Sequence, residues 1–186
     1  MNAAMDELTE LSIRTIRTER LDLTWMNPAF IAASLAGRRD TASALIAATL
    51  PEDWPDEGAR RRLGLRLEQM QRDPSESLWL LRAMISRAGK DMVGVINFHG
   101  RPNAQGQAEL GYTVFPRHQR RGYATEAATA MIRWARHDHD VRQFLLSISP
   151  DNLASLRVAA KLGFQGIGVR MDEIDGEEHV FELVQP

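Results

Sequence analysis

Residues 116–126 combine the side chains and the backbone freedom that bind phosphate groups. Their sequence is Pro-Arg-His-Gln-Arg-Arg-Gly-Tyr-Ala-Thr-Glu. Arginine donates charge-assisted hydrogen bonds to phosphate oxygens, and Gly122 can adopt a positive φ and let a ligand approach the backbone closely. An ordinary surface turn would use similar residues, so this stretch alone leaves open both a phosphate site and a plain turn.

The flanking segments predict that this stretch joins a strand to a helix. Residues 109–115 alternate in the manner of a strand, and apolar side chains then recur at helical steps. These helical positions are Ala127, Met131, Ile132, Trp134 and Ala135. The first N–H groups of a helix lack internal partners, and the helix dipole is positive at that end. Phosphates bind readily at such a place.

Two motifs together resemble those of the GNAT acetyltransferases. Residues 119–124, Gln-Arg-Arg-Gly-Tyr-Ala, match the family signature Gln/Arg-x-x-Gly-x-Gly/Ala, which wraps the pyrophosphate of acetyl-CoA. Residues 152–164 resemble the family segment Asn-x-x-Ser/Ala…Lys-x-Gly-Phe, and residues 16–23 look like the first strand of the branch that acetylates ribosomal-protein N-termini. The resemblance implies an α/β fold, the GNAT fold, with a mixed and largely antiparallel central sheet flanked by helices.

The resemblance also implies that acetyl-CoA is the acyl donor and that no acyl-enzyme forms. Thr113 and Val114 would lie beside the pantetheine arm where two parallel strands splay apart, and the N–H of Val114 would stabilise charge on the thioester carbonyl. Asn152 would contact the cofactor, although a helix cap is the alternative. The positions expected to cradle the pyrophosphate are Gln119, Arg120, Arg121, Gly122, Tyr123, Ala124 and Thr125.

The chain departs from the family pattern at two positions, Arg120 and Ala159. Arg120 stands where the family usually has an optional glycine, which costs backbone freedom but adds a charge. The tyrosine that protonates the departing thiolate in many members is replaced by Ala159. Ser155 is therefore the expected cofactor contact and thiolate partner, and it can at least donate a hydrogen bond.

The proton of the amine acceptor needs a base, which can act through water. Glu109 has the strand parity of Gly111 and Thr113 and could face the acceptor, whereas a solvated strand-end carboxylate is the alternative. The acidic loop at 52–57 could form the acceptor wall, with Trp54 as an apolar plate. Alternatively, its acids favour the start of the next helix.

The periodicity predicts a succession of strands and helices along the rest of the chain. A strand at 21–25 precedes helices at 28 onward, 41–49 and 59–71; strands at 78–85, 92–98 and 107–115 form an antiparallel meander; a helix ends near 137–140; a strand at 143–149 is buried on both faces; a helix stops at Gly163; and 166–174 and 178–184 form a hairpin.

Length and composition limit the functional classes. The 186 residues suit one domain, expected at 13–186 after a flexible tail at 1–12. A net charge of −2 gives no reason to expect a nucleic-acid or membrane partner. No signal peptide is visible and no apolar run approaches the roughly 20 residues of a membrane span, so we expect a cytoplasmic protein. Cysteine is absent and the histidines do not cluster, so no metal is expected.

These observations predict an acetyl-CoA-dependent N-acetyltransferase. The acceptor is a primary amine, either on a small molecule or at a protein N-terminus. The alternative is a non-catalytic acyl-CoA-binding sensor or subunit, because the usual tyrosine acid is missing. The sequence leaves open the identity of the acceptor, the acyl-chain preference and the formation of a homodimer.

Overall fold

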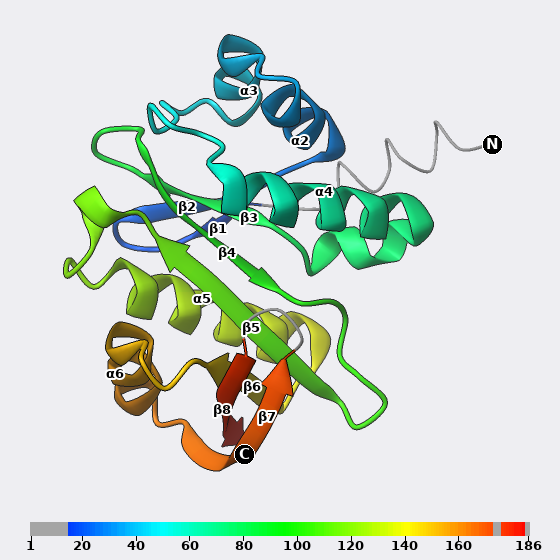
Figure 1. Cartoon of the computed structure of the whole chain (residues 1–186), viewed down its shortest axis with the longest axis vertical. Coiled ribbons are helices and arrows are strands. Elements are labelled where there is room, and N and C mark those ends of the chain that lie inside the picture. Colours follow the sequence, from blue (N-terminus) through cyan, green and yellow to red (C-terminus); the bar gives the residue numbers. More distant parts are fainter. Residues whose placement is uncertain (1–14, 173–175, 185–186) are drawn as a thin grey trace.

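An eight-stranded sheet forms the centre of the protein (Figure 1). The computed structural model describes residues 15–172 and 176–184, so the tail expected at 1–12 lies outside the described residues. The strand order is β1-β2-β3-β4-β5-β6-β8-β7, and every neighbouring pair is antiparallel except β5 and β6. The strands are β1 Ile16–Arg17, β2 Leu21–Trp25, β3 Arg82–Ser86, β4 Met92–Phe98, β5 Gln107–Val114, β6 Gln143–Ile148, β7 Gln165–Asp172 and β8 Gly176–Val184.

Helices cover both faces of this sheet, as Figure 1 shows. They are α2 Pro28–Leu35, α3 Arg39–Ile46, α4 Glu57–Arg72, α5 Tyr123–His139 and α6 Leu153–Leu162. One buried cluster joins α5 and α6 to the sheet through residues such as Met131, Leu110 and Phe144. A second cluster joins α2–α4 to the other face through residues such as Phe30 and Met92. The predicted α/β architecture, with a largely antiparallel sheet between helices, is confirmed.

Short-range signals set the helix boundaries. Asn27 caps α2 by accepting a hydrogen bond from the Phe30 N–H at 2.8 Å, and Gly163 ends α6 with a φ of 85°. Asp56 accepts from the Ala59 N–H at 2.7 Å and caps α4. In the acidic loop, Asp56 therefore serves the following helix, which was the simpler of the two interpretations.

Trp54 is partly buried and packs against the second buried cluster, so its ring does not stand free as an apolar wall for the acceptor. Its ring lies between Phe30 and Phe115, with centroid distances of 6.2 and 5.9 Å. Its indole N–H donates to the Ser34 hydroxyl at 3.1 Å. Because both the ring and the N–H are occupied, this side chain anchors the loop to the second buried cluster.

Two strand predictions are wrong in part. The strand expected at 78–85 starts at Arg82, because Pro74–Leu78 form a 3-10 turn in which Asp73 accepts from the Ser75 N–H at 3.0 Å. β6 is buried on one face and half-buried on the other. The apolar run reads as doubly buried, but the cluster beneath α2–α4 contains no residue of β6.

β5 and β6 separate part of the way along their length. They pair at Gln107 with Gln143, Ala108 with Phe144 and Glu109 with Leu145, while β5 stays paired with β4 as far as Val114. The backbone of β5 beyond Glu109 therefore lacks β6 as a neighbour. This geometry matches the splay that the family resemblance implied, and it opens the space in which the candidate site lies.

Candidate active site

A cavity of about 380 Å³ lies between the end of β5 and the N-termini of α5 and α6. All of the predicted cofactor positions except Arg121 line it, although they come from three separate elements. These positions are Thr113, Val114, Gln119, Arg120, Gly122, Tyr123, Ala124, Thr125, Asn152 and Ser155. The fold thus brings the end of β5, the start of α5 and the start of α6 together around one cavity.

Gly122 leaves the start of α5 open to a ligand. Its φ of 81° lies in the left-handed region, and the helix begins without a capping side chain. The N–H groups of Tyr123, Ala124 and Thr125 belong to the first helical turn and have no intrahelical acceptor. The Glu126 N–H is the first to bond back, to the Gly122 carbonyl at 3.0 Å. The positive end of a helix of 17 residues therefore faces the cavity.

Arg120 occupies a backbone conformation that suits glycine. Its φ is 60°, where side chains with a Cβ are strained. The neighbouring Gln119 holds the turn against the strand, since its side-chain amide donates to the Val114 carbonyl at 3.0 Å. Arg120, which replaces the family's optional glycine, therefore keeps a glycine-type backbone conformation and bears the strain of it.

A network behind the turn connects it to the N-terminal hairpin. The Glu126 carboxylate accepts from the Thr18 hydroxyl at 2.6 Å and from the Arg20 N–H at 2.8 Å. The Arg20 guanidinium pairs with the same carboxylate at 2.6 Å and also donates to the Arg121 carbonyl at 2.9 Å. Burial alone would raise the pKa of Glu126, but these hydrogen bonds lower it below its ordinary value.

The backbone of β5 presents the Val114 N–H to the opened side. The His99 N–H donates to the Glu109 carbonyl at 2.8 Å and the Phe115 N–H donates to the Val93 carbonyl at 2.9 Å. Backbone groups of odd-numbered residues in β5 therefore point to β4, and those of even-numbered residues point away from it. The Val114 N–H is thus directed to the side from which β6 has diverged.

Asn152 caps α6 and also lines the cavity. Its Oδ1 accepts from the Ser155 N–H at 3.1 Å, which is the helix-cap interpretation. The cap orders the first turn of α6 and with it the backbone of Ser155, which lines the same cavity. The expected contact of Asn152 with the cofactor stays a prediction.

Tyr112 is a cavity residue that the sequence analysis missed. Its hydroxyl is buried and, among the described residues, has no hydrogen-bond partner. Burial raises the pKa of the Tyr112 phenol, and the neighbouring Ser155 hydroxyl partly opposes the shift. Tyr112 therefore stays protonated and lies beside the expected thiolate partner. Tyr112 and Val114 are two residues apart and lie on the same face of the strand, and this spacing could have identified Tyr112 from the sequence.

Glu109 is neither free nor solvated. Arg170 donates to its two carboxylate oxygens at 2.8 and 3.1 Å, and the side chain is 18% exposed. Burial alone would raise the pKa of Glu109, but hydrogen bonds from Arg170 and the proximity of His99 lower it. A carboxyl with a lowered pKa is a weaker base, so the predicted role of Glu109 requires another group nearby.

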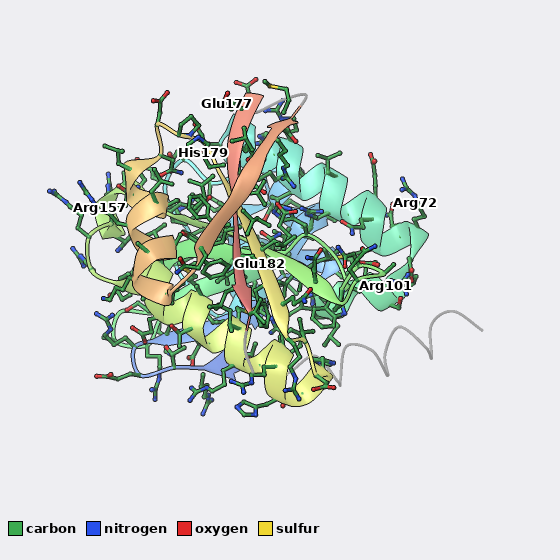
Figure 2. All side chains as sticks on the ribbon, turned by 90° about the horizontal axis from the view of Figure 1, so that it is seen from below. Arg72, Arg101, Arg157, Glu177, His179 and Glu182 are labelled. Atoms are coloured by element: carbon green, nitrogen blue, oxygen red, sulfur yellow. The ribbon has the colours of Figure 1, made fainter. Side chains whose placement is uncertain are left out.

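Other side chains complete the surroundings of the cavity. Arg157 lines it without having been predicted to, and His118, which precedes the arginine- and glycine-containing turn, lines it as well. Figure 2 shows Arg157 extending from α6 away from the sheet. Within the described residues, no group of three or more His, Asp or Glu side chains is placed to hold a metal ion. Among the same residues, no helix is both long and apolar enough to span a bilayer.

Comparison with known proteins places the chain among acetyltransferases. Residues 20–165 match the family model of the acetyltransferase (GNAT) domain. The chain is 33% identical over 86 residues to the uncharacterized N-acetyltransferase YjdG of Bacillus subtilis (strain 168), covering 46% of this chain and 49% of that protein. It is 32% identical over 96 residues to the ribosomal protein uS5-alanine N-acetyltransferase of Escherichia coli (strain K12), covering 49% of this chain and 50% of that protein.

Solved structures share the fold over almost the whole chain. The acetyltransferase (GNAT family) from Bacillus anthracis superposes with a TM-score of 0.62 at 20% identity, covering 91% of this chain and 98% of its own. The sequence matches to YjdG and to the uS5-alanine enzyme, by contrast, span about half the length of those relatives.

Proposed function

Because the chain belongs to the GNAT acetyltransferase family, we propose that it transfers an acetyl group from acetyl-CoA to a primary amine. The observation that carries this proposal is the continuity of the cavity. At one end lie the free N–H groups of the α5 start, and at the other lies the backbone exposed by the separation of β5 and β6. A pyrophosphate suits the first end, and an extended pantetheine arm with its thioester suits the second.

Each part of the donor then has a group that suits it. The first N–H groups of α5, with Arg120 and Arg121, bind the pyrophosphate. The opened edge of β5 at Thr113 and Val114 pairs with the pantetheine, and the Val114 N–H donates to the thioester oxygen as negative charge develops there. Asn152 borders the same path from the start of α6.

The reaction proceeds in a ternary complex without an acyl-enzyme. The amine nitrogen attacks the thioester carbon, the C–S bond breaks and its electron pair leaves with the sulfur. Ser155 donates a hydrogen bond to the departing thiolate, and the Tyr112 phenol beside it supports that hydroxyl. The Tyr112 hydroxyl is buried, so a hydrogen bond that it makes to Ser155 would be strengthened by the low local dielectric.

The acceptor is either a small-molecule amine or a protein N-terminus. Similarity to the ribosomal protein uS5-alanine N-acetyltransferase favours the second class. We further propose that residues 13–186 act as one domain, since both buried clusters share one sheet, and that the protein works in the cytoplasm without a metal ion. A homodimer is compatible with this proposal but is not required by it.

Turnover with a panel of amines tests the proposal directly. CoA released from acetyl-CoA is titrated with a thiol reagent, and the chain itself contributes no signal because it contains no cysteine. The panel contains peptides with free N-terminal alanine or serine, polyamines and amino acids, each with an N-acetylated control. CoA release that depends on the free amine is the expected result.

The rival interpretation, a non-catalytic acyl-CoA sensor, predicts a different outcome. A sensor would be stabilised by acetyl-CoA in a thermal melt and would release no CoA with any amine. If acetyl-CoA neither stabilised the protein nor released CoA with any amine, both the enzyme and the sensor interpretations would be contradicted.

A further inference from the structure

The imidazole of His99 lies over the central strand next to the candidate site. His99 directly follows β4, and its carbonyl accepts from the Arg66 guanidinium of α4 at 3.1 Å. A Cβ placed on Gly111 would come within 2.8 Å of His99 Nε2. The ring therefore fills the space that a side chain at Gly111 would occupy. It lies on the strand face shared by Glu109 and Thr113, opposite Tyr112.

The ring is oriented along β5. Its Nδ1 lies 3.6 Å from a carboxylate oxygen of Glu109, whereas Nε2 lies over Gly111, two residues closer to Thr113. When Nδ1 carries the proton, that N–H points to the carboxylate and Nε2 keeps its lone pair. The His99 side chain is 44% exposed, so a ligand can reach it.

Partial burial favours the neutral form of the His99 imidazole, and the charges around it act in both directions. Burial lowers the pKa of His99, Glu109 of β5 and Asp172 of β7 oppose this shift, and the cations Arg66 of α4 and Arg170 of β7 add to it. The carboxylate of Glu109 is held in place by Arg170, which also pairs with Glu178 at 2.9 Å. Near neutral pH the ring is thus an available proton acceptor beside a fixed carboxylate.

We infer that His99 is the base that takes the proton from the amine acceptor, with Glu109 as the positioning residue behind it; this inference rests on the proposed acetyl transfer. An imidazole is better matched than an ion-paired carboxylate to a proton transfer at neutral pH. Its Nε2 also lies over Gly111, in the part of β5 that has separated from β6, where the acceptor must meet the thioester.

The step balances without a further reactant. The amine nitrogen bonds to the thioester carbon and loses one proton to Nε2 of His99. The C–S bond breaks, and the sulfur leaves as thiolate within hydrogen-bonding reach of Ser155. The imidazolium is stabilised by the Glu109 carboxylate and then returns its proton to solvent.

The pH dependence of turnover tests the inference. CoA release is measured between about pH 5 and 9 with acetyl-CoA and a peptide that has a free N-terminal alanine. Since the amine itself titrates near pH 8 in every variant, the acid limb of interest lies below it. His99→Gln is expected to lower kcat by about 10²–10⁴-fold and to remove the limb below pH 6.5, with the KM for acetyl-CoA nearly unchanged. His137→Gln, near the far end of α5, is the matched control and should retain both.

A titration by NMR gives a readout that does not depend on activity. The imidazole signal missing from His99→Gln should titrate below pH 6.5 in the unaltered protein. Glu109→Gln should move it lower still, because the carboxylate that favours the imidazolium is gone. Gly111→Ala should weaken turnover while keeping every titratable group, since the added methyl displaces the ring.

Three outcomes would overturn the inference. Normal turnover and an unchanged acid limb in folded His99→Gln would exclude His99 as the base while leaving the proposed acetyl transfer intact. Loss of the limb in Glu109→Gln with an unmoved His99 signal would assign the base to Glu109 itself. Failure of the unaltered protein to acetylate any amine would remove the proposed function, and this inference with it.

Discussion

At the scale of single residues, Arg120 adds charge to the turn before α5, the proposed phosphate site, at a conformational cost. Its φ of 60° suits glycine. Arg120→Gly should be more stable to unfolding than Arg120→Ala by about 1 kcal/mol, because only glycine relieves the left-handed strain. Both variants lose the same charge, so both should bind CoA more weakly and to a similar extent. Urea denaturation and CoA titration measure the two effects; equal stabilities would show that the turn is unstrained.

Tyr112 and Ser155 should separate stability from turnover. Tyr112→Phe removes a buried hydroxyl that has no described partner, so the free protein should be equally or more stable. Its turnover should fall roughly fivefold, corresponding to about 1 kcal/mol, because the phenol lies beside Ser155 and is expected to hydrogen-bond to that hydroxyl in the reacting complex. Ser155→Ala should cost more, near about 10²-fold.

The double variant is the decisive comparison for this pair. If the phenol acts through the serine, adding Tyr112→Phe to Ser155→Ala should cost nothing further. Full additivity of the two losses, measured as kcat, would show that Tyr112 acts independently of Ser155.

At the scale of elements, the first turn of α5 depends on the turn between β1 and β2, more than 100 residues earlier in the chain. The Glu126 carboxylate accepts hydrogen bonds from Thr18 and Arg20, and the Arg20 guanidinium donates to the Arg121 carbonyl. Glu126→Gln should lower the free energy of unfolding at pH 7 by about 1–3 kcal/mol and weaken CoA binding.

The pH dependence of this effect has a definite sign. The pKa of Glu126 is lower in the folded protein than in the unfolded chain. Its contribution to stability is therefore present above the unfolded value and is lost as the pH falls through the folded one. The stability difference between Glu126→Gln and the unaltered protein should disappear in acid. Glu177→Gln, on a side chain that is 54% exposed, is the matched control and should change little at any pH.

At the scale of the whole molecule, cofactor binding should stabilise the entire fold, because the cavity draws on β5, α5 and α6 together. Acetyl-CoA at 100 times its dissociation constant should add about 2.7 kcal/mol to the free energy of unfolding. Gly122→Val should melt cooperatively but gain no such increment, because a β-branched residue resists a φ of 81° and its Cβ would lie 3.4 Å from the Arg20 guanidinium that holds the turn. An equal increment in that variant would place the phosphates elsewhere.

The arrangement of the two buried clusters on one sheet explains this coupling. The meander β3–β4–β5 contributes to both clusters, so loosening either face disturbs the strand that carries Thr113 and Val114. The meander and the cap at Gly163 follow from alternation and turn chemistry, and both were predictable. The start of β3 and the burial of β6 were not, because they depend on which helices cover each face.

The sequence by itself determined the local parts of the site. A glycine that favours a positive φ and an amphipathic segment after it predict a turn followed by a helix, since each signal acts within a few residues, and the arginines beside the glycine make that turn a candidate for phosphate binding. Only the tertiary structure decided three contacts of the site. Arg170 pairs with the Glu109 carboxylate, His99 lies over Gly111, and the Tyr112 phenol lies beside Ser155. Those contacts join distant segments through strand order and register, and periodicity carries no information about either.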